Sequence, residues 1–252
     1  MPDVKNTLQS YSAELENKNI EVVEHKCTRN LDGQKCTTCV LGVLLSDHGK
    51  QIEQYMLSWL TKKYNVISVR QPLPGSLFEY PALRYAQLYS IERNEPVLYL
   101  HTKGAANPRA FQKKTINLWK HEFVKSKQEY ENHLDEYDLL LPYSGPQNIT
   151  WFNGFIATSK AYSAIPQIPI FENRFYYETL FKGSSLKCYG RRFTGIVRTD
   201  TEDSTNLIYR DVNHFSSSFS PVNGFFHDLW ASVYPCLKNA SRKEVTQDTD
   251  AE

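Results

Sequence analysis

The chain has 252 residues, of which 40% are hydrophobic and 23% charged, the usage of an ordinary globular protein. Its 29 basic and 28 acidic residues give a net charge of +1, which argues against nucleic acid or an anionic membrane surface as a general partner. The first residues carry no apolar secretion signal, and the longest strongly apolar run, Cys39 to Leu45, is far shorter than the roughly 20 residues of a membrane span. We therefore expect a cytoplasmic protein with no transmembrane segment, for which peripheral membrane association stays open.

The five cysteines are odd in number and scattered, so we expect free thiols rather than a disulfide framework. Four residues, His25, Cys27, Cys36 and Cys39, have ligand types and spacings that suit a tetrahedral zinc ion. Against zinc, they contain only one C-x-x-C pair, and Cys39 opens an apolar run typical of a buried strand. The sequence leaves the zinc site open as an alternative.

The distribution of polar and apolar residues along the sequence predicts that the chain has three parts. Residues 1–35 are polar and poorly periodic, so we expect an N-terminal extension with a helix around Leu8 to Leu15 that adds no core. Residues 36–238 carry the pattern of a folded domain. Residues 239–252 form a polar tail that we expect to be disordered.

Strand and helix patterns alternate between Val40 and Leu100. Continuous apolar runs predict strands covered on both faces, and apolar residues three and four positions apart predict helices. Ser46, which follows the first strand, is a good helix N-cap. This alternation is typical of parallel strands joined by right-handed crossovers. We expect strands at Val40–Leu45, Val66–Val69 and Val97–Leu100, and helices at Ile52–Leu60 and Leu83–Ile91.

The second half of the domain is less regular. A helical pattern begins at Phe111, but its basic residues come first and its acidic residues later, which opposes the helix dipole. We therefore expect a break near Glu131 to Leu134. Gly183 to Ser220 carries only weak strand signals. Further strands are expected at Leu139–Leu141 and Phe152–Ala157, and further helices at Glu172–Phe181 and Gly224–Leu237.

The third predicted strand ends in a group of polar residues. In open α/β sheets, ligands bind beyond the carboxyl ends of the strands, where His101, Thr102 and Lys103 stand. Lys103 offers a point charge for a phosphate, His101 offers a donor or a proton carrier, and Gly104 lets a backbone amide come close. These residues fit a diphosphate leaving group, whose developing charge needs nearby cations. On spacing alone, exposed edge residues are the simpler interpretation.

Several segments together resemble a family of bacterial and viral polysaccharide glycosyltransferases. That family shows a Tyr-Glu-x-Pro-Thr-Leu-like helix start, a Leu-His-Thr-Lys-Gly strand end and a Trp-Arg pair, where this chain has Trp119-Lys120. The likeness runs from about Val40 to Phe181, and its first motifs are more specific than the last two. The similar segments are Phe78–Leu83, Val97–Gly104, Trp119–Lys120, Trp151–Ala157 and Glu172–Glu178.

The resemblance implies an α/β protein with a GT-A-like fold, in which helices flank a mostly parallel sheet. It also implies a nucleotide-sugar donor, a glycan or lipid-linked glycan acceptor, and a role in surface polysaccharide synthesis. Most GT-A enzymes hold a divalent metal ion with Asp-x-Asp at this strand end, where this chain has His101-Thr102-Lys103. We expect a cationic side chain to replace the metal, so that transfer needs no cofactor; Mn²⁺ or Mg²⁺ is the alternative.

An inverting transfer needs a carboxylate that accepts the proton of the acceptor hydroxyl. Glu178 is the first candidate and Glu172 the second, because the helix dipole already explains an acid at a helix start. Trp151 would stack on the acceptor sugar, with core packing as its alternative. The predicted site comprises Glu178 and His101 as catalytic residues, Lys103, Thr102, Ser46 and Glu79 on the donor side, and Trp151, Asn153 and Glu172 on the acceptor side.

Two other classes of function stay open. A nucleotide or glycan binder with the same fold but no catalysis is favoured by the missing Asp-x-Asp. A phosphoryl-transfer enzyme with His101 as nucleophile would need carboxylates or a metal cluster beside the histidine, and the sequence places none nearby.

Overall fold

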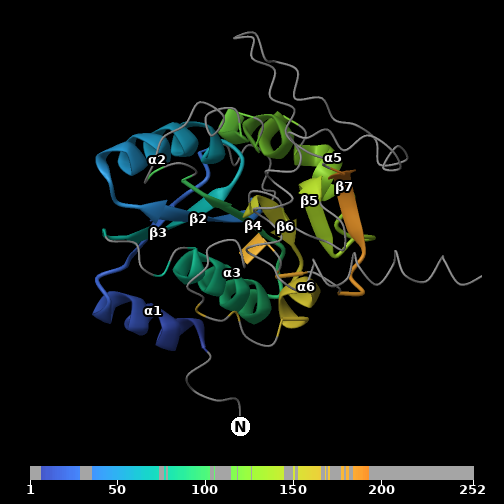
Figure 1. Ribbon diagram of the computed structural model, residues 1–252. Coiled ribbons are helices and arrows are strands. Elements are labelled where there is room, and N and C mark those ends of the chain that lie inside the picture. The colour runs from blue at the N-terminus through green and yellow to red at the C-terminus, as the bar shows by residue number, and fades with distance from the viewer. Residues whose placement is uncertain are drawn as a thin grey trace, which may run out of the picture. The chain divides into compact units, whose positions relative to one another are not determined.

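The computed structural model describes most of the chain up to residue 192 (Figure 1). The chain divides into two units, Met1–Arg192 and Phe193–Glu252, and the second unit lies outside the described residues. The predicted terminal helix, the predicted domain end at residue 238 and the predicted tail therefore lie outside them too. The described residues are 7–28, 36–73, 77, 79–102, 105, 115–117, 119–125, 127–144, 150, 153–165, 168, 170, 177–178, 180–181 and 184–192, with the backbone alone for 142–144 and 190–192.

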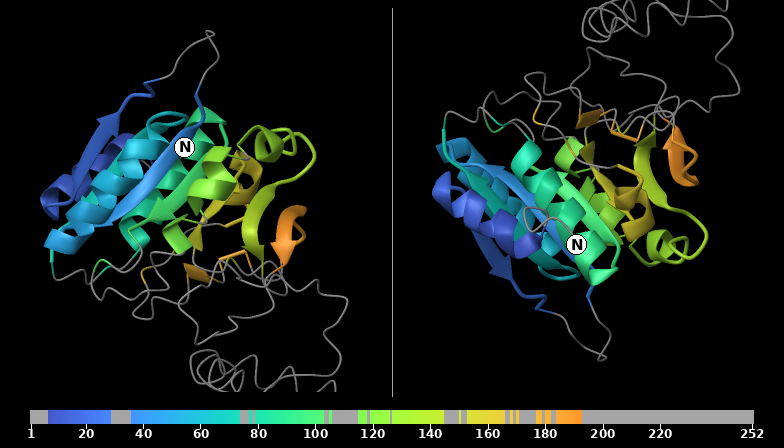
Figure 2. Two further views of the ribbon diagram at one scale, coloured as in Figure 1. Left: turned by 90° about the horizontal axis from the view of Figure 1, so that it is seen from above. Right: turned by 90° about the horizontal axis from the view of Figure 1, so that it is seen from below.

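One sheet organises the described part of the chain, with helices packed on its faces (Figures 1 and 2). Its strands are β1 (Glu21–His25), β2 (Thr38–Leu44), β3 (Asn65–Gln71), β4 (Val97–His101), β5 (Leu139–Ser144), β6 (Phe155–Ala157) and β7 (Cys188–Arg192). They lie in the order β1-β3-β2-β4-β6-β5-β7. The pairs β2–β3, β2–β4 and β5–β7 are parallel, and the pairs β1–β3, β4–β6 and β5–β6 are antiparallel.

The sheet is therefore mixed, and the expectation of a mostly parallel sheet is wrong. β5 and β6 follow each other along the chain and pair antiparallel, which requires no crossover helix. β6 has only three residues, too few for an apolar pattern to indicate the strand direction. β1 adds an antiparallel edge strand from a segment for which the sequence predicts no strand.

The three central strands confirm the predicted crossovers. β2 pairs in parallel with β3 on one side and β4 on the other, so that Val40 lies opposite both Ile67 and Tyr99. Helix α2 (Asp47–Leu60) connects β2 to β3, and helix α3 (Tyr80–Arg93) connects β3 to β4. The two helices cover opposite faces of the sheet (Figure 1). This arrangement brings the carboxyl ends of β2 and β4 side by side.

Helix α2 begins directly at the end of β2. The Ser46 hydroxyl accepts a hydrogen bond from the Gly49 amide at 2.8 Å, as predicted for an N-cap. A Cβ atom at Gly49 would lie 1.9 Å from the Leu44 carbonyl oxygen, so a side chain at this position would collide with the strand end. The turn from β2 into α2 is consequently tight, and it fixes Ser46 beside the end of the strand.

The N-terminal segment forms part of the core. Helix α1 (Leu8–Asn17) confirms the helix expected around Leu8 to Leu15 and packs on α3, with Tyr11 and Leu15 buried. The Tyr11 hydroxyl donates to the Pro81 carbonyl at 3.3 Å. The expectation that this segment adds no core is therefore wrong. The error arose because α1 buries only a narrow apolar stripe and its other residues are polar.

The helical segment after β4 carries Trp119 and then changes its winding. A π-helical turn spans His121–Lys125, and helix α5 spans Lys127–Glu131. The helix ends at Glu131, which confirms the break expected near Glu131 to Leu134. The strands expected at Leu139–Leu141 and Phe152–Ala157 correspond to β5 and β6, whereas most of the expected helix at Glu172–Phe181 lies outside the described residues.

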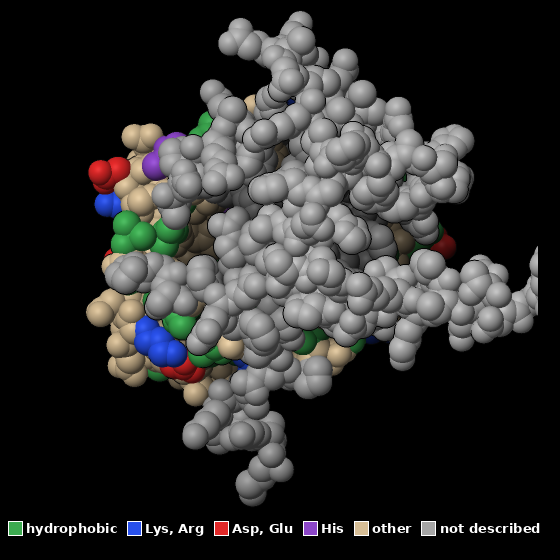
Figure 3. Space-filling model, in the orientation of Figure 1, with side chains coloured by type: hydrophobic (Ala, Val, Ile, Leu, Met, Phe, Trp, Pro, Cys, Tyr) green, Lys and Arg blue, Asp and Glu red, His purple; other side chains and the backbone are tan. Residues whose placement is uncertain are grey.

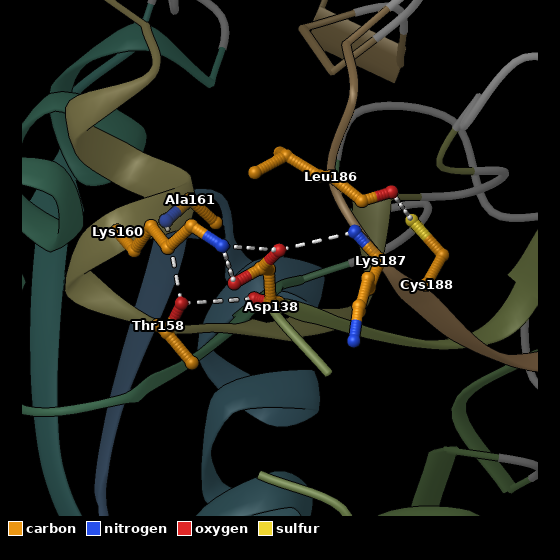
Figure 4. A network of polar contacts seen from close by, with 7 residues as sticks. All are labelled: Asp138, Thr158, Lys160, Ala161, Leu186, Lys187 and Cys188. Carbon is orange, nitrogen blue, oxygen red and sulfur yellow. Dashed lines mark hydrogen bonds and ion pairs between the residues drawn. The ribbon is translucent and has the colours of Figure 1, made fainter. Parts of the chain in front are cut away.

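A polar network around Asp138 joins β5, β7 and the short helix α6 (Ser159–Ser163) (Figure 4). The Lys160 ammonium lies 2.9 Å from Asp138 Oδ1, and the Lys187 amide donates to Oδ2 at 3.0 Å. The Asp138 carbonyl in turn accepts hydrogen bonds from the Thr158 amide and hydroxyl. Burial opposes ionisation of Asp138, but the bonds from Lys160 and Lys187 and their charges hold its pKa below the ordinary value.

Where described side chains are visible on the face shown in Figure 3, acidic, basic and apolar ones are interspersed. This distribution agrees with the net charge of +1. Among the helices that the structure describes, none is both long and apolar enough to cross a membrane.

Candidate functional site

The carboxyl ends of β2 and β4 are tied together by the predicted donor-side residues. The Thr102 amide donates to the Gly42 carbonyl at 2.8 Å, and the Thr102 hydroxyl accepts from the Leu44 amide at 3.2 Å. The Ser46 hydroxyl, besides capping α2, donates to the Ala105 carbonyl at 2.8 Å. Thr102 and Ala105 stand on either side of Lys103-Gly104, which lie outside the described residues. The chain is thus bound to β2 before this dipeptide and to the N-cap of α2 after it.

The side chains of Glu79 and His101 are in contact at this end of the sheet. Glu79 Oε1 lies 3.6 Å from His101 Nε2, an ion-pair contact when the imidazole is protonated. Glu79 precedes the first turn of α3, but its side chain does not cap the helix and is turned to the strand end instead. The side chains of His101 and Glu79 are 12% and 17% exposed, so water screens their interaction only partly.

Asn153 holds the other oxygen of the Glu79 carboxylate. Its Nδ2 donates to Glu79 Oε2 at 2.6 Å, and the Asn153 side chain is 1% exposed. The Asn153 backbone has a φ of 49°, a left-handed conformation that asparagine tolerates better than most residues. This conformation belongs to a tight turn in which the Asn153 amide donates to the Thr150 carbonyl at 3.1 Å. The turn therefore presents the amide group to Glu79 in a fixed direction.

Thr150 extends the contacts to Glu178. The Thr150 hydroxyl lies 3.0 Å from Asn153 Oδ1 and 3.1 Å from the Glu178 carbonyl oxygen, and its single proton serves one of them at a time. The Thr150 amide also donates to the Glu178 carbonyl at 2.8 Å. Glu178 itself is 5% exposed. A continuous polar chain thus runs from His101 through Glu79, Asn153 and Thr150 to the backbone of Glu178.

Two aromatic rings pack around His101. The Trp119 ring meets the His101 ring edge to face at 5.5 Å between centroids, and Trp119 is fully buried. A Cβ atom at position 154 would lie 2.3 Å from Trp119 Nε1, so Gly154 makes room for this ring. The Tyr99 ring lies 6.3 Å from the His101 ring, and burial, then the Glu79 charge, raise the Tyr99 pKa well above its ordinary value. Tyr99 is therefore a neutral phenol at any physiological pH.

The structure brings together six of the nine predicted site residues. Glu79, His101 and Asn153 are in direct contact, and Glu178 joins them through Thr150. Thr102 and Ser46 anchor the neighbouring strand ends. The other three predicted site residues, Lys103, Trp151 and Glu172, lie outside the described residues.

Sequence reasoning missed two residues of this site. Thr150 carries no chemical signal in the sequence beyond its position just before Trp151. Gly154 lies within the aromatic segment after Asn153, and a glycine between aromatic residues was a usable signal for a close ring contact. Neither has a reactive group, and each acts through the neighbour that it positions.

The four residues considered for zinc do not form a ligand set. Within the described residues, no three His, Cys, Asp or Glu side chains are grouped so that they could hold a metal ion. Cys39 is completely buried and His25 lies two strands away, with Val66 of β3 between them in the sheet register. Burial, with the nearby Arg70 charge, lowers the pKa of His25 and keeps its imidazole neutral.

Comparison of the chain with protein-family models, with curated proteins and with solved structures found no match.

Proposed function

We propose that this chain is a glycosyltransferase with a GT-A-like fold, which moves a sugar from a nucleotide-sugar donor to a glycan or lipid-linked glycan acceptor. The observation that carries the proposal is the polar chain from His101 to Glu178 at the carboxyl end of β4, the edge at which open α/β sheets bind ligands. In this proposal the enzyme works in the cytoplasm, builds surface polysaccharide and has no nucleic-acid partner.

On the donor side, His101 and Lys103 supply positive charge to the leaving diphosphate. The Glu79 carboxylate, 3.6 Å from His101 Nε2, would stabilise a protonated imidazole through its opposite charge. The protonated His101 can then donate a hydrogen bond to a phosphate oxygen as the sugar–phosphate bond breaks. Thr102 is bound to the end of β2 and Ala105 to Ser46 at the start of α2, and both residues lie next to the Lys103-Gly104 dipeptide in the sequence. The two cations would take the electrostatic role that a metal ion has in other GT-A enzymes.

On the acceptor side, Glu178 is proposed to take the proton of the attacking hydroxyl. Its backbone carbonyl contacts Thr150, which also contacts Asn153, and this supports a location near the same end of the sheet as Glu79. Glu79 is the competing candidate, because its carboxylate is the more exposed of the two. Trp151 and Glu172 are proposed to contact the acceptor sugar, by stacking and by hydrogen bonding respectively.

The second candidate function is a nucleotide or glycan binder without turnover. It is favoured by the engagement of both Glu79 oxygens, one by Asn153 and the other by His101. A carboxylate held in this way makes a rigid recognition element and a poorer proton acceptor, because both of its contacts stabilise the ionised form.

The purified full chain should be incubated with a panel of nucleotide sugars, with and without a chelator, while donor hydrolysis and nucleotide binding are followed. The proposal expects slow hydrolysis of at least one donor that the chelator does not abolish. Lys103→Ala should weaken nucleoside diphosphate binding by about tenfold or more, because one phosphate contact is lost. Lys18→Ala, which removes the exposed lysine that follows α1, is the matched control and should bind as the unaltered chain does.

Binding without hydrolysis of any donor would favour the binder. An unchanged affinity and turnover in Lys103→Ala would rule out the diphosphate role of this lysine.

A further inference from the structure

Cys27 and Cys36 approach each other at the amino ends of the central strands. Cys27 follows β1 and Cys36 precedes β2, and β3 lies between these two strands in the sheet. The first residue of β3, Asn65, reaches both cysteines with its side-chain amide. Its Oδ1 accepts from the Cys27 amide at 3.1 Å, and its Nδ2 donates to the Cys36 carbonyl at 3.3 Å. One side chain thus holds the backbones of both cysteines.

The two thiols interact as well. Burial, and then the Cys27 thiol, raise the pKa of Cys36 to about 11. Both cysteines are partly exposed free thiols. Two strands on either side of a third strand lie about 10 Å apart. Cys27 and Cys36 stand outside β1 and β2, so strand pairing does not hold them at this separation. Their side chains can therefore close the remaining gap without breaking the pairing of β1 and β2 with β3.

The other described cysteines lack these properties. Cys39 is completely buried in β2, and Cys188 directs its sulfur to the Leu186 carbonyl at 3.6 Å (Figure 4). The arrangement is thus a pair of thiols rather than the four-residue group considered for zinc.

We propose that Cys27 and Cys36 form a reversible disulfide and make this end of the sheet a thiol–disulfide exchange site for low-molecular-weight disulfides such as oxidised glutathione. The Cys27 thiolate attacks the glutathione disulfide, forms a mixed disulfide and releases one glutathione thiolate. Cys36 then loses its proton to solvent, and its sulfur attacks Cys27 Sγ and releases the second glutathione. Two protein thiols are oxidised to one disulfide, and one glutathione disulfide is reduced to two thiols.

The raised pKa of Cys36 supports the proposed order of these steps. A thiol with a pKa near 11 is almost entirely protonated at neutral pH, so it is a poor first nucleophile. It becomes effective once the mixed disulfide on Cys27 lies beside it, because the reaction is then intramolecular. Cys27 is accordingly the attacking residue and Cys36 the resolving residue.

The disulfide would close the connection of residues 28–35 between β1 and β2. Cys36 lies at the amino end of β2, whereas His101 and Thr102 lie at the carboxyl end of β4. The inference is therefore independent of the proposed transferase activity. Closing the loop restricts the unfolded chain, so the oxidised protein should melt a few degrees higher, by roughly 4 to 8 °C.

The full chain should be equilibrated in mixtures of reduced and oxidised glutathione, alkylated, digested with trypsin and analysed by mass spectrometry. We expect two of the five thiols to be lost and Cys27 to be linked to the peptide that begins at Cys36. Cys36 and Cys39 share that tryptic peptide, so the digest is repeated on Cys39→Ser, which should keep the link. In Cys36→Ser, Cys27 should retain glutathione as a mixed disulfide, because the resolving thiol is gone.

Three outcomes would overturn the proposal. The first is stable glutathione on both cysteines of the unaltered chain with no link between them. The second is loss of the link in Cys39→Ser, and the third is one zinc ion per chain that blocks alkylation of both thiols. A cysteine variant that fails to fold does not decide the matter, because the link in the unaltered chain is read directly.

Discussion

Two acids, the buried Asp138 and the partly buried Glu79, each contact two neighbouring residues, yet these neighbours differ in kind. Asp138 binds the Lys160 ammonium and the Lys187 amide (Figure 4). Its own backbone already binds Thr158 and Lys187, so the carboxylate reinforces links that the main chain makes. Glu79 binds Asn153 and His101, and the described backbone hydrogen bonds include none between Glu79 and either of them.

This difference separates a structural network from a positioning network. The carboxylate of Asp138 adds stability to contacts between β5, α6 and β7 that exist without it. The carboxylate of Glu79 joins two groups from different elements and fixes the direction in which His101 and Asn153 point. A substitution at Asp138 should therefore change stability most, and one at Glu79 should change function most.

The largest expected effect is a loss of donor turnover in the Glu79→Gln variant. The glutamine carbonyl can still accept the Asn153 hydrogen bond, but the charge that favours protonated His101 is gone. We expect donor turnover to fall by about 100-fold, a barrier increase of about 2.7 kcal/mol, while the free energy of unfolding falls by less than about 1 kcal/mol. Steady-state kinetics and urea unfolding measure the two quantities on the same preparation.

Glu21→Gln is the matched control, because Glu21 lies on the edge strand β1 and its exposed carboxylate pairs with Arg70. Glu178→Gln tests the competing assignment of the proton acceptor. If Glu178→Gln keeps full turnover and Glu79→Gln loses all of it, Glu79 is the base. Full turnover in Glu79→Gln, with a loss of stability instead, would make this network structural as well.

The second largest expected effect is a loss of stability in the Asp138→Asn variant. Asparagine cannot accept from both Lys160 and Lys187, and its amide group would oppose one of these donors. We expect the free energy of unfolding to fall by about 2 kcal/mol, since charge-assisted hydrogen bonds are lost at a buried site. Urea denaturation at neutral pH with an unchanged m-value is the measurement.

Lys160→Ala serves as the control from the same network. The Lys160 side chain is 74% exposed, so its removal should cost less than about 1 kcal/mol. Equal losses of unfolding free energy in the two variants would show that the stability comes from the ion pair with Lys160 and not from the hydrogen bond of the Lys187 amide.

The central strands were predictable because their signals are local. The apolar runs of β2, β3 and β4 and the helical spacing of α2 and α3 each lie within a short window. Ser46 was recognisable as a cap for the same reason. The direction of a short strand, and the strand with which it pairs, depend on distant parts of the chain. For this reason the antiparallel positions of β1 and β6 could not be predicted.

The site was predictable in its residues but not in its contacts. His101 and Glu79 stood out through their position and motif, and Asn153 through its place in an aromatic segment. The sequence gives no sign that the Asn153 amide binds Glu79 across 74 residues, since this contact depends on how β6 pairs with β4. Thr150 and Gly154 were missed because their roles appear only when neighbouring elements are in place.

The smallest expected effect is the pH dependence of the stability that Asp138 contributes. Its folded pKa lies below the ordinary value of 3.8, so the contribution is fully present above that value and is lost as the pH falls through the folded pKa. The difference in unfolding free energy between the unaltered chain and Asp138→Asn should stay constant from pH 7 to about pH 5 and narrow below about pH 4. Urea unfolding in a series of buffers measures it. Glu14→Gln is the control, because it removes a carboxylate from the solvent-exposed Glu14–Lys18 pair. A difference that stays constant down to pH 3 would mean that the shape of Asp138, and not its charge, holds β5, α6 and β7 together.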